Sequence, residues 1–214
     1  TTKRSATDMD IGTFYLHVTV LPLVLDFAAL RGPRDEAYFR RWKDGRRNIL
    51  FVGRVAPNKR HEDLLAAFYY FQKFVCPLSR LLLVGSFLGM EAYQSLLETK
   101  AKDLGLSYVD FTGSVSQPYL LAAYDAADAF LCLSDHEGFC IPLIEAMVRG
   151  VPVLAYDAGA VAETMDGAGI LFREKRFDWI SETLGRVCED GALRFMTEDG
   201  EQHITAGEVS LRNK

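Results

Sequence analysis

Two glutamates stand eight positions apart in the stretch "SDHEGFCIPLIEAMVRGVPVLAY", at Glu137 and Glu145. A strand-like run, "AFLCLS", ends at Ser134 just before them, and Pro142 suits the first turn of a helix. We therefore expect Glu137 in a loop and Glu145 in or just beyond the first helical turn. Gly138 and its neighbours can present backbone N–H groups, to which the helix start adds its positive dipole end. Carboxylates accept hydrogen bonds from hydroxyls, so this stretch predicts a positive centre between two hydroxyl-binding ends.

A second group of candidate residues follows the run "NILFVG" in the segment "GRVAPNKRHEDLL". Gly53 permits close backbone approach, and Arg54 and Lys59 flank a Pro-Asn turn before a predicted helix. A helix N-terminus beside two cations can bind an anion, and arginine can grip phosphate oxygens in two places. Alternatively, both cations are solvated surface charges.

A similar alternative exists for the glutamates, since Glu137 could be solvated and Glu145 could merely favour a helix N-terminus. The combination of Arg54, Lys59, Gly138 and both glutamates favours the binding interpretation. The predicted ligand has phosphates in its middle and hydroxyls at both ends.

The elements that position these residues alternate between strand-like and helical patterns. Short apolar runs predict strands at 48–53, 80–85, 107–113, 129–134 and 151–156, with a shorter one at 169–172. Amphipathic stretches between and after them predict helices at 59–75, 89–105, 116–128, 141–150 and 177–190. This alternation predicts an α/β fold with a doubly wound, Rossmann-like parallel sheet, in which ligands bind beyond the carboxyl ends of the strands.

We expect this nucleotide-binding domain to span residues 45–195. Residues 1–44 are expected to be an N-terminal remnant and connecting segment, and residues 196–214 a C-terminal tail.

Composition excludes several classes of function. The 214 residues carry a net charge of −5, which disfavours an extended surface for binding nucleic acid or an anionic membrane. The four cysteines form no CxxC pair and are expected to be buried free thiols in a reducing compartment. Clustered Cys and His at short spacing are missing, His61 and His136 are far apart, and the carboxylates of "DMD" (8–10) are near the terminus, so no metal site is predicted.

Four ordered segments make the chain recognisable. The segments "VGRVAPNKRHEDLL", "VDFTGSV", "AYDAADAFLCLSDHEGFCIPLIEAMVRGVPVLAY" and "AETMDGAGILF" together resemble the C-terminal, donor-binding half of a GT-B glycosyltransferase of family four, also called group 1. The two glutamates match that family's signature of Glu, seven residues, Glu. The resemblance covers about residues 45 to 195.

The resemblance implies a retaining transferase that moves a hexosyl group from a nucleotide-sugar to an acceptor hydroxyl, without a metal or other cofactor. It assigns Glu137, Arg54 and Lys59 to catalysis, with the two cations holding the diphosphate and neutralising the departing nucleotide. Glu145 would bind the ribose, and Glu137 with the backbone of Gly138 and Phe139 would contact the sugar and distal phosphate. The base would lie near Gly113–Val115 and Ser134. The full donor-binding set is Gly53, Arg54, Lys59, Gly113, Ser114, Val115, Ser134, Glu137, Gly138, Phe139, Cys140, Ile141 and Glu145.

The sequence departs from the family at two places that matter. The stretch "TVLPLVLDF" resembles the crossing between the two halves, so the acceptor half is expected to lie outside this chain, which alone should transfer little or nothing. Ala158 and Gly159 stand where relatives tend to carry a Gly-Gly pair.

Several alternatives and partners follow from the same resemblance. The alternatives are a nucleotide-sugar 2-epimerase, a phosphorylase or a non-catalytic nucleotide-sugar-binding subunit. The expected partners are a UDP- or GDP-linked hexose and the missing acceptor domain, with no nucleic acid. A role in polysaccharide biosynthesis is implied, with a cytoplasmic location and any peripheral contact with the inner membrane face made through absent regions.

Overall fold

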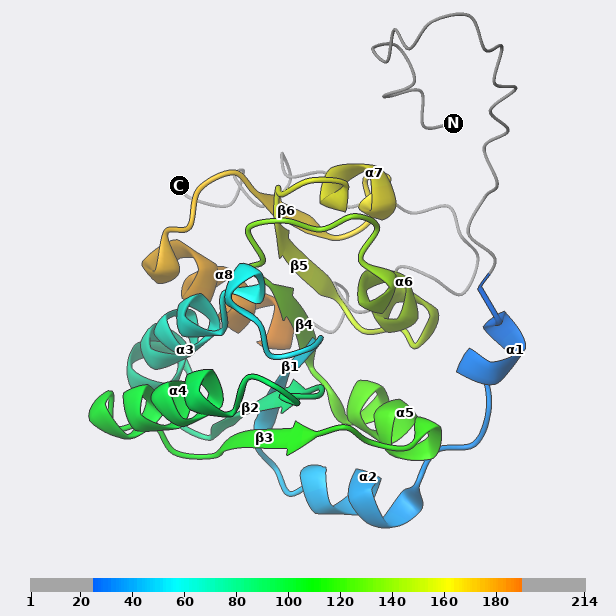
Figure 1. Cartoon of the computed structure of the whole chain (residues 1–214), viewed down its shortest axis with the longest axis horizontal. Coiled ribbons are helices and arrows are strands. Elements are labelled where there is room, and N and C mark those ends of the chain that lie inside the picture. The colour runs from blue at the N-terminus through cyan, green and yellow to red at the C-terminus, as the bar shows by residue number, and fades with distance from the viewer. Residues whose placement is uncertain (1–24, 190–214) are drawn as a thin grey trace, which may run out of the picture.

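A six-stranded parallel sheet forms the centre of the molecule in the computed structural model, which describes residues 25–189 (Figure 1). The strands lie in the order β3-β2-β1-β4-β5-β6, and every neighbouring pair is parallel. Their bounds are β1 Arg47–Val52, β2 Ser79–Val84, β3 Val109–Gly113, β4 Ala129–Cys132, β5 Val153–Tyr156 and β6 Ile170–Phe172. The predicted α/β class and doubly wound parallel sheet are confirmed.

Helices cover both faces of the sheet. Figure 1 shows α3 (His61–Tyr70), α4 (Glu91–Asp103) and α8 (Phe177–Glu189) on one side of the sheet, with α5 (Gln117–Ala126) and α6 (Ile141–Val148) on the other. Strands buried on both faces need apolar side chains throughout, and Leu81, Leu82 and Leu83 of β2 are all buried accordingly.

All six strands form where the apolar runs predicted them, with small differences at their ends. The predicted strand 107–113 starts late because Tyr108 has a left-handed backbone, with φ of 57°, which a strand cannot accommodate. The predicted strand 129–134 is shorter because its pairing with β5 ends at Cys132, opposite Ala155. Ser134 therefore lies in the loop, although it is buried.

The predicted helix 59–75 is divided into three pieces. A 3-10 turn (Pro57–Lys59) precedes α3, and Arg60 between them has a left-handed φ of 52°. After α3 the chain continues as a π-helical turn, Phe71–Val75, which is closed by a hydrogen bond from Cys76 N to Phe71 O. The four later helices agree with prediction to within two residues at each end.

Three helices were not predicted: α1 (Phe27–Leu30), α2 (Glu36–Trp42) and α7 (Val161–Met165). Helix α2 packs against α5, and its Trp42 is buried in the same core as the sheet. The charged segment before β1 therefore includes a helix that covers the domain. Where the domain begins and ends remains a prediction, and 1–24, "DMD" and 190–214 lie outside the described residues.

Candidate functional site

The candidate site lies where the strand order reverses, between β1 and β4. These two strands pair in parallel, with Ile49 opposite Ala129. The chain leaves β1 towards α3 on one face and leaves β4 towards α6 on the other (Figure 1). The two loops therefore diverge at the carboxyl ends, which is where open α/β sheets bind ligands. They touch once through the backbone, because Asp135 N donates to Asn58 O at 2.9 Å.

Lys59 and Glu137 form an ion pair across this reversal point. The Nζ atom of Lys59 lies 2.7 Å from Glu137 Oε1 and 2.6 Å from Oε2. Glu137 is only 5% exposed, whereas the Lys59 side chain is 23% exposed. A nearly buried carboxylate needs a compensating charge, so Lys59 neutralises Glu137 from the solvent side.

Gly159, in the loop after β5, leaves room for the backbone of Glu137. It has a left-handed φ of 61°, and a Cβ there would lie 2.3 Å from the carbonyl oxygen of Glu137. Ala160 N donates to that same oxygen at 2.9 Å. The second position of the Ala158–Gly159 pair therefore has to be glycine, whereas the buried Ala158 accommodates a methyl group.

Arg54 is exposed, and its Nη2 donates to Leu88 O in the loop after β2 at 3.0 Å. That loop approaches the one after β1 closely, because a Cβ on Gly85 would lie 2.0 Å from Gly53 O. The close backbone approach predicted at Gly53 is thus made by Gly85, in the loop after β2. The structure joins Lys59 directly to Glu137 and joins Arg54 to the neighbouring loop.

The side chain of Glu145 is held by a hydrogen bond from a tyrosine. Glu145 lies within α6 and is partly buried, and the hydroxyl of Tyr124 donates to its Oε2 at 2.7 Å. Tyr124 is fully buried in α5, and burial, followed by the charge of Glu145, raises the pKa of the Tyr124 phenol well above its usual value. The phenol therefore stays protonated and continues to donate.

The loop from Gly138 to Ile141 is the open part of the site. A Cβ at Gly138 would meet nothing within 4 Å, and Phe139 and Ile141 are exposed. Cys140 precedes α6 with a left-handed φ of 59°, an unfavourable conformation for a residue with a Cβ. Thr164 Oγ1 donates to Phe139 O and so ties the loop to α7.

The other predicted base-contacting residues lie at separate positions. Gly113 ends β3, two strands away from β1, with a φ of 71°. Ser114 is exposed and Val115 is partly buried, whereas Ser134 is buried beside Cys132. No contact joins Gly113–Val115 to the Lys59–Glu137 pair among the described hydrogen bonds and ion pairs.

Lys175 is a residue that the sequence reasoning missed. Its Nζ lies 2.9 Å from Asp63 Oδ2 and 2.5 Å from Asp135 Oδ1, so it connects the chain after β6 to α3 and to the loop after β4. Arg60 also pairs with both aspartates. The sequence offers no local signal for the whole network, because Asp135 and Lys175 are far along the chain from Arg60 and Asp63.

The thiols of Cys132 and Cys140 were also not predicted to meet. Together with Glu137 they form a group whose sulfur and carboxylate atoms all lie within 4.8 Å of one another. The contact with Cys140 lowers the pKa of the Cys132 thiol, and the contact with Cys132, followed by burial, raises that of Cys140. The four cysteines form no disulfide, as predicted, but Cys76 and Cys140 are only partly buried.

Neither described histidine joins this group. His136 is exposed, as expected for a loop residue, and His61 is buried edge-on against Phe51 with ring centroids 5.1 Å apart. Burial lowers the pKa of His61 to about 4, and the attraction of Glu62 and of the backbone at Ala56 only partly offsets it. His61 is therefore a neutral core residue.

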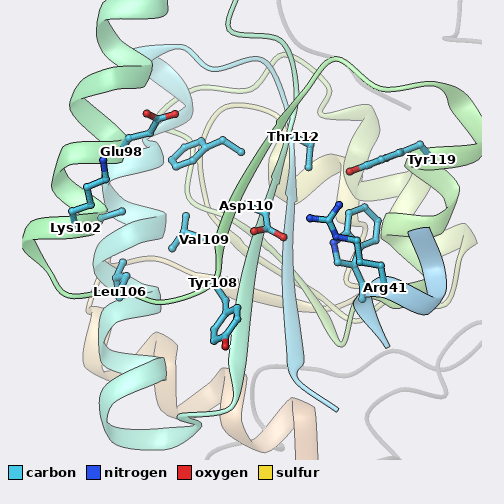
Figure 2. Close-up of a pocket in the computed structure, with 12 residues that line it drawn as sticks. Arg41, Glu98, Lys102, Leu106, Tyr108, Val109, Asp110, Thr112 and Tyr119 are labelled. Atoms are coloured by element: carbon cyan, nitrogen blue, oxygen red, sulfur yellow. The ribbon is translucent and has the colours of Figure 1, made fainter. Parts of the chain in front are cut away.

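A cavity of about 460 Å³ lies along the outer side of the edge strand β3, away from the candidate site. Figure 2 shows Asp110 and Thr112 on the strand and Tyr108 just before it, with Lys102 of α4 on one side and Tyr119 of α5 on the other. None of the predicted donor-binding residues lines this cavity.

Across residues 25–189, every helix is too short or too polar to cross a lipid bilayer.

The family described as "Glycosyl transferases group 1" matches residues 35–202 of the chain. The GDP-mannose-dependent alpha-mannosyltransferase of Mycolicibacterium smegmatis is 40% identical over 129 residues, which is 59% of this chain and 30% of that protein. O-antigen chain mannosyltransferase B of Escherichia coli is 28% identical over 147 residues, covering 68% of this chain and 38% of that protein. The chain thus spans about a third of the length of these relatives.

Solved structures share the fold. The C-terminal domain of the group 1 family protein LpcC from Francisella tularensis superposes with a TM-score of 0.64 at 24% identity, covering 80% of this chain and 91% of that chain. Anabaena HepE in complex with UDP and glucose gives a TM-score of 0.68 at 22% identity, covering 79% of this chain and 47% of that chain. The described domain therefore has the fold of the C-terminal domain of LpcC.

Proposed function

The chain belongs to the group 1 glycosyl transferases, and we propose that it binds the nucleotide-sugar donor of a retaining hexosyltransferase that acts without a metal. The sugar would pass to an acceptor hydroxyl held by a part of the enzyme outside the described residues. The chain alone would bind donor but transfer little. The observation that carries the proposal is the ion pair between Lys59 and Glu137 at the reversal point of the sheet.

Lys59 supplies a cation that a diphosphate can recruit. Its ammonium neutralises Glu137 and remains accessible from the solvent side. An entering diphosphate would share or take over this cation and so place its negative charge beside Glu137. Stabilising the departing nucleoside diphosphate with a fixed cation lowers the barrier to breaking the sugar–phosphate bond.

Backbone and arginine donors would complete the phosphate site. The open backbone around Gly138 and the start of α6 provide N–H groups for phosphate oxygens. Arg54 would exchange its bond to the Leu88 carbonyl for a phosphate, because a phosphate carries negative charge and can accept two parallel N–H bonds from one guanidinium. Glu137, freed in part from Lys59, would accept from hydroxyls of the sugar.

Glu145 would hold the ribose. Two vicinal hydroxyls can donate to one carboxylate, and Tyr124 occupies only Oε2, so Oε1 remains for the ligand. Ser114 and its neighbours at the end of β3, with Ser134, would lie toward the base.

Calorimetric titration of the 214-residue chain with GDP-mannose, UDP-glucose and an ADP-sugar tests the proposal. GDP-mannose comes first because the names of several relatives specify it. We expect saturable one-site binding of at least one donor, and we expect its affinity to fall at least tenfold in Lys59→Met. The matched control is Lys100→Met, which removes an exposed lysine from α4 and should leave binding unchanged. Absence of heat with every donor would contradict the proposal.

A further inference from the structure

Cys132, Cys140 and Glu137 form a compact set of metal-ligating atoms, and the two thiols have no role in the proposed transfer reaction. Their two sulfur atoms and one carboxylate oxygen all lie within 4.8 Å of one another. The Cys132 Sγ atom is 3.9 Å from Glu137 Oε1 and 3.5 Å from Ser134 Oγ. The side chains of Cys132 and Glu137 are almost completely buried, so both are largely shielded from water.

The backbone conformation brings the two thiols and the carboxylate together. Cys132 is the last residue of β4, and the chain then loops out through Glu137 and returns at Cys140, eight residues later. The return depends on the left-handed conformation of Cys140, which is unfavourable for a residue with a Cβ. Asparagine or glycine would suit this conformation better, yet a thiol stands there.

The spacing suits a thiophilic divalent cation. In a tetrahedral site with metal–sulfur bonds of about 2.3 Å, two sulfur ligands lie about 3.8 Å apart. The three groups therefore need only small displacements to surround one ion. Thiolates select Zn²⁺ and Cd²⁺ over Mg²⁺ and Ca²⁺, which prefer oxygen ligands.

We propose that Cys132, Cys140 and Glu137 bind one thiophilic divalent cation, Zn²⁺ or Cd²⁺, and that the bound cation excludes the nucleotide-sugar. Two S–H protons leave to solvent as two metal–sulfur bonds form, so binding tightens as the pH rises. No electron is transferred.

Lys59 explains why the cation and the donor compete. Its ammonium contacts both oxygens of Glu137, so a metal that takes Oε1 must displace or repel it. The metal would also restrain the Gly138–Cys140 loop, whose backbone is proposed to hold the phosphates. The exclusion rests on the proposed donor site, whereas metal binding itself does not.

Titration with CdCl₂ of the whole chain, kept reduced with a phosphine, tests the site without any nucleotide. Binding is read from the ultraviolet charge-transfer absorption of cadmium–thiolate bonds. We expect saturation at one equivalent, at least tenfold weaker binding in Cys132→Ser, and unchanged binding in the matched control Cys76→Ser, whose thiol lies elsewhere. Undiminished absorption in Cys132→Ser would overturn the proposal, and MgCl₂ should give no signal.

A second variant guards against a folding defect in Cys132→Ser. Lys59→Met removes the competing ammonium and should tighten Cd²⁺ binding about tenfold, and unchanged or weaker binding would contradict the assigned position of the metal.

Nucleotide titrations in the presence of Cd²⁺ then test exclusion, with Cys132→Ser as the control for chelation by the nucleotide itself. Loss of nucleotide affinity in wild type alone supports exclusion, and an equal change in wild type and Cys132→Ser overturns it. If no nucleotide binds even without metal, the proposed function fails while the metal titration still decides the site.

Discussion

Lys59 Nζ contacts both carboxylate oxygens of Glu137, at 2.7 and 2.6 Å, and so joins the loops that follow β1 and β4. These loops leave the sheet on opposite faces, and the pair forms where they diverge. Lys59 therefore has a structural role, because it neutralises a nearly buried carboxylate. Its proposed second role is to hold a diphosphate.

The first prediction concerns the stability of this pair. Lys59→Met leaves the carboxylate of Glu137 without its cation, and we expect a loss of about 1–3 kcal/mol in the free energy of unfolding. Adding Glu137→Gln to Lys59→Met should restore part of that loss, because the uncompensated charge disappears. Urea denaturation of wild type, Lys59→Met, Glu137→Gln and the double variant measures the coupling free energy between the two side chains.

The matched control for that cycle is Arg176–Asp178, a pair whose side chains are more than half exposed. Such pairs couple by less than about 1 kcal/mol. If the Lys59–Glu137 coupling is no larger than the Arg176–Asp178 coupling, the pair does not stabilise the loops.

The second prediction concerns Gly159, whose missing Cβ leaves room for the Glu137 carbonyl. Gly159→Ala should destabilise the fold by about 2–4 kcal/mol and weaken donor binding, since it combines a left-handed φ with a backbone clash. Gly150 has a similar φ of 68° but nothing within 4 Å of its Cβ position, so Gly150→Ala isolates the cost of φ alone. Thermal unfolding and calorimetry measure both effects. Equal effects of the two substitutions would show that the contact with Glu137 does not matter.

The third prediction concerns Tyr124, the residue that orients Glu145. Tyr124→Phe removes one hydrogen bond to a carboxylate, so we expect it to weaken GDP or UDP binding several-fold through the ribose and to leave inorganic diphosphate binding unchanged. Tyr93→Phe is the control, because Tyr93 donates to Glu62 outside the proposed site. The prediction is wrong if diphosphate and nucleotide lose affinity together, or if Tyr93→Phe weakens nucleotide binding as much.

The fourth prediction concerns pH and His61. Its folded pKa of about 4 lies below the unfolded value of 6.5, so the unfolded chain gains a proton first as the pH falls. Stability should therefore decrease between about pH 6.5 and 4, by up to roughly 3 kcal/mol from this residue, and level off below. Denaturation of wild type and His61→Leu across that range isolates the contribution. Parallel pH profiles for the two proteins would refute it.

Much of the fold was predictable because its signals are local. Apolar runs such as the one at β2 mark strands buried on both faces, and Gly105 and Gly150 follow the ends of α4 and α6 with left-handed φ. The short helices α1 and α7 lack a periodic apolar face, since each has only four or five residues. The left-handed residue Arg60, which separates α3 from the preceding turn, leaves no comparable signal.

The candidate site was predictable as a set of loops but not as a set of contacts. Placement of Lys59 and Glu137 at one edge of the sheet follows from the strand order, whereas their direct pairing depends on loop conformations. The Cys132–Cys140 contact depends on a left-handed cysteine, and the Tyr124–Glu145 bond joins two helices. Such relations arise from packing between distant segments and have no signature in spacing.

The central claim, that Lys59 serves a diphosphate at the reversal point of the sheet, is tested most directly by comparing wild type with Lys59→Met in calorimetric titrations of GDP or UDP and of the matching nucleoside. The account predicts at least a tenfold loss of affinity for the nucleoside diphosphate and less than a twofold change for the nucleoside. Equal losses for both ligands, or no loss for the diphosphate, would contradict it.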